Sequence, residues 1–342
     1  MSRWRSAARA GAADVEAWRR DPTSLGRLWL GRFEEGPLLQ VAARRILLAL
    51  HLPPRLLAPF AGRTEGARSV LELTTYWRGA RRALRDRDAW RRLTQGTTIL
   101  MYHAIGEDDE PATRFRLRRR SFERQMSKLA RRRRILSLHE YVALRLTHQL
   151  PPAKSVVITF DDGYLDTRTL AAPVLARLEL PATVFLVTKR VGPGRVWQGD
   201  GELAGRPLVS WEEVEELRDL GFDVGGHTQT HPVLTELPTT KLKAEIAGSR
   251  SDLAERLGTP PAAFAYPYGK WNDAAAQAAG AAGFSSACTV SAGRNGPATP
   301  LYALRRTEIH GEASRLRFAL GLATGDTTIL DRLARRMRRR ER

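Results

Sequence analysis

The chain has 342 residues, and its 56 Lys and Arg against 37 Asp and Glu give a formal net charge of +19. This length allows one large domain or two small ones. A single cysteine, Cys288, excludes an internal disulfide and a Cys-rich metal site. No apolar run is long enough to span a membrane. The basic start MSRWRSAARA lacks the apolar core of a secretory signal. We therefore expect a cytoplasmic protein, or one peripheral at the inner membrane face.

The positive charge is distributed unevenly along the chain. Residues 1–100 and 114–134 each carry a balance of +10, and residues 331–342 carry +5, whereas residues 135–304 carry −3. Arginine-rich segments therefore flank a mildly acidic middle. No module that combines aromatic and basic residues is visible, so we expect contacts with an anionic membrane surface and no nucleic-acid partner.

The first 95 residues contain short helical patterns separated by Pro and Gly. Residues 38–52 form an amphipathic pattern, and residues 69–93 mix aromatic residues with Arg at helical spacing. Two interpretations stay open: a helical extension packed on the main domain, or an interfacial segment that lies on anionic lipid. The predicted domains are an Arg-rich helical extension (1–95), a catalytic domain (96–328) and a basic tail (329–342).

From residue 97 onward, strand and helix patterns alternate. Ser210 with Glu213 has the spacing of a capping box at the start of one of these helices, and Gly258 is expected to end another. The alternation predicts a parallel α/β architecture. The expected strands are 97–103, 155–160, 182–187, 222–226, 262–266 and 284–290, and the expected helices are 115–134, 135–146, 167–179, 210–221, 239–257 and 272–282.

Three of the expected strands end in residues suited to metal chemistry. Asp161-Asp162 follows the strand 155–160, His227 and His231 follow 222–226, and Tyr268 follows 262–266. Active sites of βα folds form at the C-terminal ends of the strands. Two histidines four residues apart on one helical turn would face the same ion. Two imidazoles and one carboxylate leave open coordination positions, as a catalytic zinc site requires.

Each of these signals also has an ordinary structural interpretation. A pair of histidines is often a structural pair, and Asp-Asp-Gly after a strand is often a turn. The three strand ends together, in this order, are far less expected by chance. Their conjunction therefore favours a catalytic site.

The motifs resemble those of the polysaccharide deacetylases, carbohydrate esterase family 4 with its NodB-homology domain. Thr159 to Gly163 reads TFDDG, His227 to Pro232 reads HTQTHP, and Pro267 to Gly269 reads PYG. The resemblance covers about residues 97–325 and implies a distorted (β/α) barrel. It also implies a divalent metal, usually zinc, with Asp162, His227 and His231 as its ligands. By the same resemblance, Asp161 is the catalytic base and the backbone N–H of Tyr268 stabilises the oxyanion.

The chain departs from the family pattern at several positions. Ala265 stands where the family has an arginine that orients the catalytic base, and residues 284–305 contain no Asp-Trp pair. His310 is a candidate general acid, although the family's preceding leucine is missing, and it could equally be a surface histidine. His103 is a rival acid or a substrate contact. Trp197 is either a sugar-stacking platform or a loop anchor.

The resemblance implies a metal-dependent hydrolase that removes an N-acetyl group from an amino sugar of a polysaccharide or glycan precursor. Its candidate substrate-binding residues are His103, Trp197 and Tyr268. One alternative is a deacylase or deformylase of a lipid-linked amino sugar. Another is a degenerate barrel that binds a glycan without turnover, which the missing arginine and Asp-Trp pair suggest.

Overall fold

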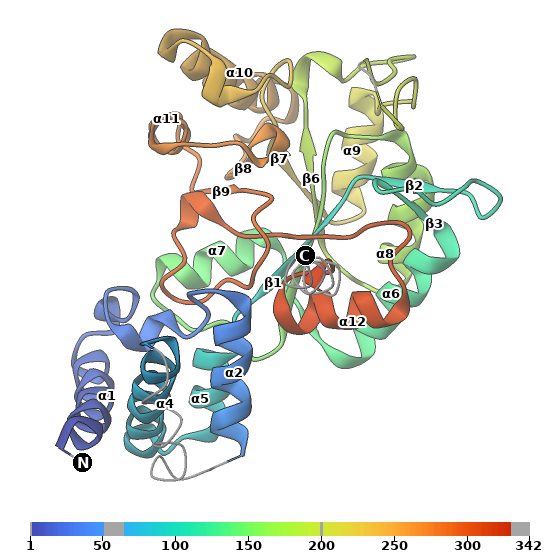
Figure 1. The fold of residues 1–342 in the computed structure, drawn as a ribbon. Helices are drawn as coiled ribbons and strands as arrows, with labels where there is room; N and C mark the ends of the chain where they lie inside the picture. Colours follow the sequence, from blue (N-terminus) through green and yellow to red (C-terminus); the bar gives the residue numbers. More distant parts are fainter. Residues whose placement is uncertain (1, 51–64, 199–200, 330–342) are drawn as a thin grey trace, which may run out of the picture. The chain divides into compact units, whose positions relative to one another are not determined.

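The computed structural model describes residues 2–50, 65–198 and 201–329, and the chain divides into two compact units (Figure 1). The N-terminal unit consists of Met1–Thr97 with Leu144–Lys154 and Asn295–Thr299, and the barrel unit contains the rest. The two short additions to the N-terminal unit lie within the range 96–328 that we assigned above to the catalytic domain. The predicted basic tail lies, from residue 330 on, outside the described residues.

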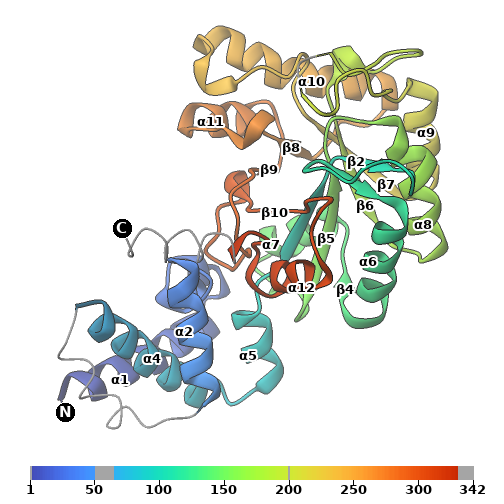
Figure 2. The same cartoon turned by 45° about the vertical axis from the view of Figure 1, so that its right-hand side comes forward.

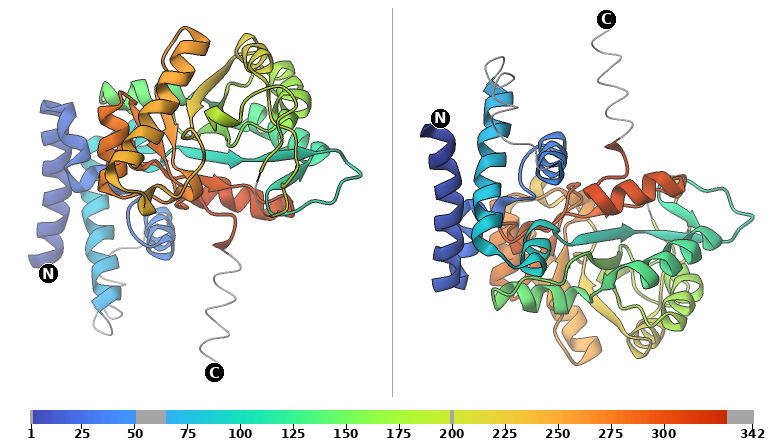
Figure 3. Two further views of the ribbon diagram at one scale, coloured as in Figure 1. Left: turned by 90° about the horizontal axis from the view of Figure 1, so that it is seen from above. Right: turned by 90° about the horizontal axis from the view of Figure 1, so that it is seen from below.

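The N-terminal unit is built on helices. Helices α1 and α4 run side by side (Figure 3), and their backbones are in close contact. A Cβ atom on Gly79 would lie 2.0 Å from the carbonyl oxygen of Ala8, and one on Gly11 would lie 2.1 Å from that of Tyr76. Glycine at both positions therefore permits this packing. The helices are α1 (Ser2–Arg20), α2 (Leu38–Ala49), α4 (Glu65–Leu84) and α5 (Arg87–Thr94), with the 3-10 turns η1 (Pro22–Gly26) and η2 (Trp29–Arg32).

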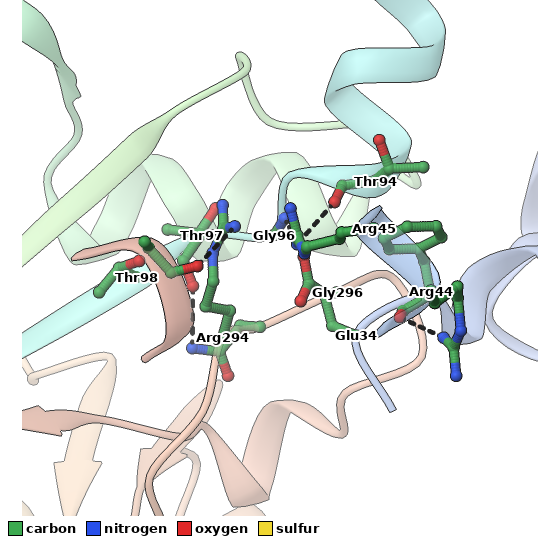
Figure 4. Close-up of polar contacts among 12 residues, drawn as sticks. Glu34, Arg44, Arg45, Thr94, Gly96, Thr97, Thr98, Arg294 and Gly296 are labelled. Atoms are coloured by element: carbon green, nitrogen blue, oxygen red, sulfur yellow. Dashed lines mark hydrogen bonds and ion pairs between the residues drawn. The ribbon is translucent and has the colours of Figure 1, made fainter. Parts of the chain in front are cut away.

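A buried carboxylate ties the segments of the N-terminal unit together (Figure 4). The side chain of Glu34 is 4% exposed, pairs with Arg45 and accepts a 3.0 Å hydrogen bond from the backbone N–H of Gly96. Arg45 also donates to the carbonyl oxygen of Thr94 at 2.9 Å. Glu34 therefore links η2, α2 and the segment that leaves α5.

The barrel unit is organised by one curved parallel sheet of order β10-β1-β5-β6-β7-β8-β9 (Figure 2). Strand β4 pairs with the first two residues of β5. A separate parallel pair is formed by β2 and β3. The strands are β1 (Thr98–Tyr102), β2 (Ala104–Gly106), β3 (Arg116–Arg118), β4 (Arg134–Ile135), β5 (Ser155–Phe160), β6 (Ala182–Leu186), β7 (Phe222–Gly226), β8 (Ala263–Ala265), β9 (Ser286–Cys288) and β10 (Thr307–Glu308).

Helices connect these strands, so the predicted distorted (β/α) barrel with helices before it is confirmed. Strand β5 is buried along its whole length, as expected for a parallel strand covered on both faces. The helices are α6 (Arg119–Arg132), α7 (Leu138–Leu146), α8 (Ala172–Arg177), α9 (Trp211–Asp219), α10 (Thr239–Leu257), α11 (Asp273–Ala281) and α12 (Arg315–Thr324).

Local capping signals predicted the helix ends well. Ser210 and Glu213 form the predicted capping box of α9, and Gly258 ends α10 in the left-handed conformation, with φ 68°. One other expectation is wrong, because the expected helix 115–134 begins with strand β3. The helical pattern 69–93 is confirmed and is divided between α4 and α5. Arg85, with φ 60°, lies at that break.

None of the helices in residues 2–50, 65–198 and 201–329 combines the length and the apolar character that crossing a bilayer requires.

Candidate active site

A cavity of about 420 Å³ opens at the C-terminal ends of the barrel strands and brings together most of the predicted site residues. This is the location at which parallel βα folds place their active sites. The predicted residues that line it are His103, Asp161, Asp162, Trp197, His227, His231 and Tyr268.

Asp162, His227 and His231 converge on one point. The Nε2 atoms of His227 and His231 each lie 3.5 Å from Oδ1 of Asp162, and all three side chains are buried. Metal–nitrogen bonds of 2.0–2.1 Å place the ligands of a tetrahedral zinc ion about 3.3 Å apart. The three donor atoms are therefore spaced to share one ion.

The hydrogen bond of His227 also fits a metal site. Nδ1 of His227 lies 2.7 Å from the carbonyl oxygen of Ala265, which only accepts, so Nδ1 carries the proton and Nε2 presents a lone pair. Nδ1 of His231 is buried without a hydrogen-bond partner. Ala265 thus contributes its backbone where the family pattern has an arginine side chain.

The electrostatics of Asp162 and His231 favour the ligand states, whereas the pKa of His227 is raised, because Asp162 and Asp161 outweigh the effect of its burial. Burial opposes the charged carboxylate of Asp162, but His227 and His231 outweigh this effect and lower its pKa below the usual value. Burial lowers the pKa of His231 to about 3, so this imidazole is neutral at physiological pH. An ionised carboxylate beside a neutral imidazole is a suitable donor pair for a divalent cation.

The segment that carries the two histidines is a loop, so the predicted helical turn is wrong. Thr228 and His231 both have positive φ values, 66° and 68°, which no α-helix contains. The Thr228 hydroxyl accepts a 2.9 Å hydrogen bond from the backbone N–H of His231. Glu245 of α10 accepts from the backbone N–H groups of Gln229 and Thr230 at 2.9 and 3.0 Å. These contacts fix the loop that carries His231, and the carbonyl oxygen of Ala265 orients His227.

Asp161 points to the other side of this strand end and meets Arg306. The guanidinium donates to both carboxylate oxygens, at 2.6 and 2.7 Å, and both side chains are almost completely buried. Arg306 also donates to the carbonyl oxygen of Thr289 at 2.9 Å. Burial opposes the charge of Asp161, but Arg306 outweighs it and holds the pKa of Asp161 below its usual value.

Arg306 is the functional residue that the sequence did not predict. Arg306 directly precedes β10. In the sheet, Thr307 of β10 pairs with Leu100 of β1, and Leu100 pairs with Ile158 of β5. The Arg306 side chain must therefore extend toward the C-terminal end of β5 to reach Asp161. The available signal was Ala265 itself, since the loss of the family's arginine there leaves Asp161 to be held by another residue.

Two aromatic side chains flank His231. The ring of Tyr268 lies 4.6 Å from the imidazole and that of Trp197 lies 5.1 Å from it. Tyr268 is 58% exposed and has a positive φ of 58°, a strained conformation typical of functional loops. Trp197 is also covered by the guanidinium of Arg190, 4.4 Å from its ring centre.

The two candidate acids occupy different places. His103 lines the cavity, with its ring 4.8 Å from that of Phe115. His310 is not among the lining residues, but its Nε2 lies 3.5 Å from the carboxylate of Glu308, which does line the cavity. Arg114 donates to both oxygens of Glu308, at 2.9 and 3.0 Å.

Comparisons with known proteins agree with this geometry. Residues 148–287 match the family model of polysaccharide deacetylase. The chain is 27% identical over 212 residues to YxkH of Bacillus subtilis (strain 168), named as a candidate polysaccharide deacetylase, and the match covers 62% of this chain and 70% of YxkH. It is 28% identical over 149 residues to the poly-β-1,6-N-acetyl-D-glucosamine N-deacetylase of Staphylococcus epidermidis, covering 41% of this chain and 49% of that protein.

Solved structures give the same result. IcaB from Ammonifex degensii superimposes with a TM-score of 0.58 at 27% identity, covering 68% of this chain and 97% of IcaB. The Streptococcus pyogenes deacetylase PplD, solved in complex with acetate, gives 0.57 at 25% identity, covering 64% of this chain and 94% of PplD. The fold and the site thus define a hydrolase of the deacetylase class. Residues 148–287 thus resemble the polysaccharide deacetylase family in sequence, and the barrel unit resembles its solved structures in fold.

Proposed function

We propose that this chain removes N-acetyl groups from N-acetylglucosamine residues of a glycan, using a metal ion held by Asp162, His227 and His231. This proposal rests on the convergence of these three donors beside Asp161, which Arg306 keeps ionised. Relatives named as N-acetylglucosamine polymer and polysaccharide deacetylases support the substrate class.

We assign zinc to the site, because two imidazoles and one carboxylate form a common donor set of catalytic zinc. When bound, the ion supplies a Lewis acid and lowers the pKa of a water molecule toward 7. The three residues leave open coordination positions on the cavity side. The donor set accommodates other first-row divalent ions as well, so metal identification belongs to the test.

Asp161 serves as the general base. It is ionised at neutral pH because Arg306 offsets the effect of burial, and it adjoins the ligand Asp162. A proton taken from the attacking water therefore goes to a carboxylate oxygen of Asp161. The backbone N–H of Tyr268 donates to the oxygen of the tetrahedral intermediate, and the rings of Tyr268 and Trp197 flank the sugar.

The leaving amine must receive a proton before it departs, and His103 is placed to give it. His103 lines the cavity that contains Asp161, whereas His310 reaches the cavity only through Glu308. We expect His103→Ala to lower kcat by at least about 100-fold and His310→Ala by less than about tenfold. If the two effects are reversed, His310 is the acid and His103 is a substrate contact.

The proposed reaction is tested by acetate release from N-acetylglucosamine oligomers. We expect release by the purified chain, loss after treatment with a chelator, and recovery on addition of Zn²⁺. The same samples, assayed for formate with an N-formylated substrate, test the deformylase alternative. Absence of acetate release by the metal-loaded chain from every N-acetylated oligomer would overturn the proposed substrate class.

We further propose that the chain works in the cytoplasm or at the inner membrane face. The exposed arginine-rich surfaces support this location, because the cytoplasmic leaflet carries anionic lipid. Fractionation of cells into soluble and membrane fractions, at low and high salt, is the measurement that checks it.

A further inference from the structure

A second large cavity of the barrel unit is strongly basic and lies away from the active site. It has a volume of about 1050 Å³ and is lined by residues of α6, α8 and the start of α12. We call it the flank groove. Its charged lining consists of six cations and one anion, namely Arg124, Lys128, Arg131, Arg132, Arg177, Arg315 and Glu123.

The anion neutralises little of this charge. Glu123 lies 3.6 Å from Arg119 and 3.8 Å from Arg177, so two arginines share one carboxylate. Arg124 donates to the hydroxyl of Ser121 at 2.7 Å. Among the described residues, the remaining four lining cations have no carboxylate within ion-pair distance; they are Lys128, Arg131, Arg132 and Arg315. The groove therefore presents an uncompensated positive field.

The groove is unsuited to the glycan of the proposed reaction. An N-acetylated amino-sugar chain is neutral, and its deacetylated product carries ammonium groups, which six cations would repel. The catalytic cavity has different lining residues, with no residue shared between the two. A partner with negative charge is required instead.

An apolar side chain beside the groove favours lipid among anionic partners. Leu316 is 61% exposed and stands between Arg315 and Arg317 on the first turn of α12. An exposed leucine flanked by arginines suits the boundary between headgroups and acyl chains. The one aromatic lining residue, Phe318, is 3% exposed, so it offers no platform for the stacking of nucleic-acid bases.

We propose that the flank groove binds the anionic headgroups of a membrane surface, with Leu316 inserted at the interface. Helix α12 begins shortly after β10, and α6 directly follows β3, so both helices start at the catalytic end of the barrel. From this end the groove extends to the last turn of α6 and the last residue of α8, at the opposite end of the barrel. The sequence continues past α12 with the basic residues 331–342, which carry a balance of +5.

The test is co-sedimentation of the full chain with vesicles. We expect binding to vesicles of phosphatidylcholine mixed with phosphatidylglycerol, weakening at high salt, and much weaker binding to phosphatidylcholine alone. Replacing Arg124, Lys128 and Arg131 together by Gln should weaken binding by at least about tenfold, since each basic residue near an anionic surface contributes several-fold. Leu316→Ser should weaken binding with little change in its salt dependence.

A matched control removes the same charge elsewhere on the barrel. Lys241, Lys243 and Arg256 are exposed on α10, and their joint replacement by Gln should leave vesicle binding within about twofold. Acetate release from a soluble oligomer should be unchanged in both triple variants, which separates this proposal from the proposed reaction. Equal binding by the two triple variants would overturn it. Binding of polyphosphate or nucleic acid without binding of the anionic vesicles would also overturn it.

Discussion

At the scale of single residues, the central feature is the pairing of Asp161 with Arg306. The family pattern places the arginine that orients the base near β8, where this chain has Ala265. Arg306 instead contacts both carboxylate oxygens of Asp161 from the segment before β10. Planar guanidinium geometry matters here, because it fixes both oxygens of the carboxylate while offsetting the cost of its burial.

Replacement of Arg306 should change the pH dependence of the reaction. In Arg306→Met, burial of Asp161 is no longer offset, so the pKa of Asp161 rises and the base is protonated over a wider range. We expect kcat to fall by about 100-fold at neutral pH and the acid limb of the pH–rate profile to move up by about 1–3 units. Arg306→Lys keeps the charge and should move the limb less. An unmoved acid limb in Arg306→Met, with the metal retained, would contradict this role.

The sequence predicted Asp161, Asp162, His227, His231 and Tyr268 because each lies in a short contiguous motif. Arg306 could not be predicted in this way. Its position beside Asp161 depends on the order of the sheet, which places β10 next to β1 and one strand away from β5. No local pattern reports a contact between residues separated by 145 positions.

At the scale of elements, helix α10 sets the conformation of the metal-binding loop. Glu245 accepts hydrogen bonds from the backbone of Gln229 and Thr230, and also from the Thr230 hydroxyl at 2.7 Å. The loop lies between the two histidines in sequence and contains left-handed residues, so it needs such support.

We expect Glu245→Gln to weaken metal binding by about tenfold, because one amide oxygen cannot accept all three hydrogen bonds. Titration of the metal-free chain with Zn²⁺ measures this effect. Glu255→Gln, on the same helix and exposed, is the control and should bind zinc as the unaltered chain does. Equal affinities of the two variants would show that Glu245 does not support the loop.

Glu308 of β10 should make the free energy of unfolding depend on pH in the acid range. Burial opposes its charge, but His310 and Arg114 outweigh this effect and lower its pKa from 4.5 to about 2. A carboxylate whose pKa is lower in the folded state stabilises the fold above pH 4.5, and this stabilisation disappears as the pH falls from 4.5 to 2. Urea unfolding over this range should therefore show a shallower pH dependence for Glu308→Gln; an identical slope would refute the assignment.

Prediction at this scale succeeded where the signals are local. The capping box at Ser210 and the terminal Gly258 defined helix ends, because side-chain caps and left-handed glycines act within a few residues. Strand β3 was mistaken for the start of a helix. Its three residues are held by pairing with β2, and that long-range contact overrides their local preference.

At the scale of the whole molecule, the net charge of +19 separates into distinct surfaces. The sequence located the arginine-rich segments but did not show what they form. Part of the basic segment 114–134 becomes α6, and with Arg177 and Arg315 it makes the flank groove. In the N-terminal unit, by contrast, Arg45 forms an ion pair with the buried carboxylate of Glu34.

The buried carboxylate of Glu34 should contribute strongly to the stability of the N-terminal unit. Glu34→Ala leaves Arg45 and the Gly96 N–H without their buried acceptor, so we expect a loss of about 3 kcal/mol in the free energy of unfolding of this unit. Glu16→Ala removes an exposed pair with Arg19 and should cost less than about 0.5 kcal/mol. Urea denaturation of both variants measures the difference, and similar losses would rule out the proposed role of Glu34.

The assignment of metal ligands and base is tested most directly by measuring bound zinc and acetate release together in two neighbouring variants. Asp161→Asn should retain about one zinc per chain and lose acetate release, because the ligands remain and the base is gone. Asp162→Asn should lose both, because the carboxylate ligand is gone. Retention of deacetylase activity by Asp161→Asn, or full zinc occupancy in Asp162→Asn, would contradict the assignment of roles to these two carboxylates.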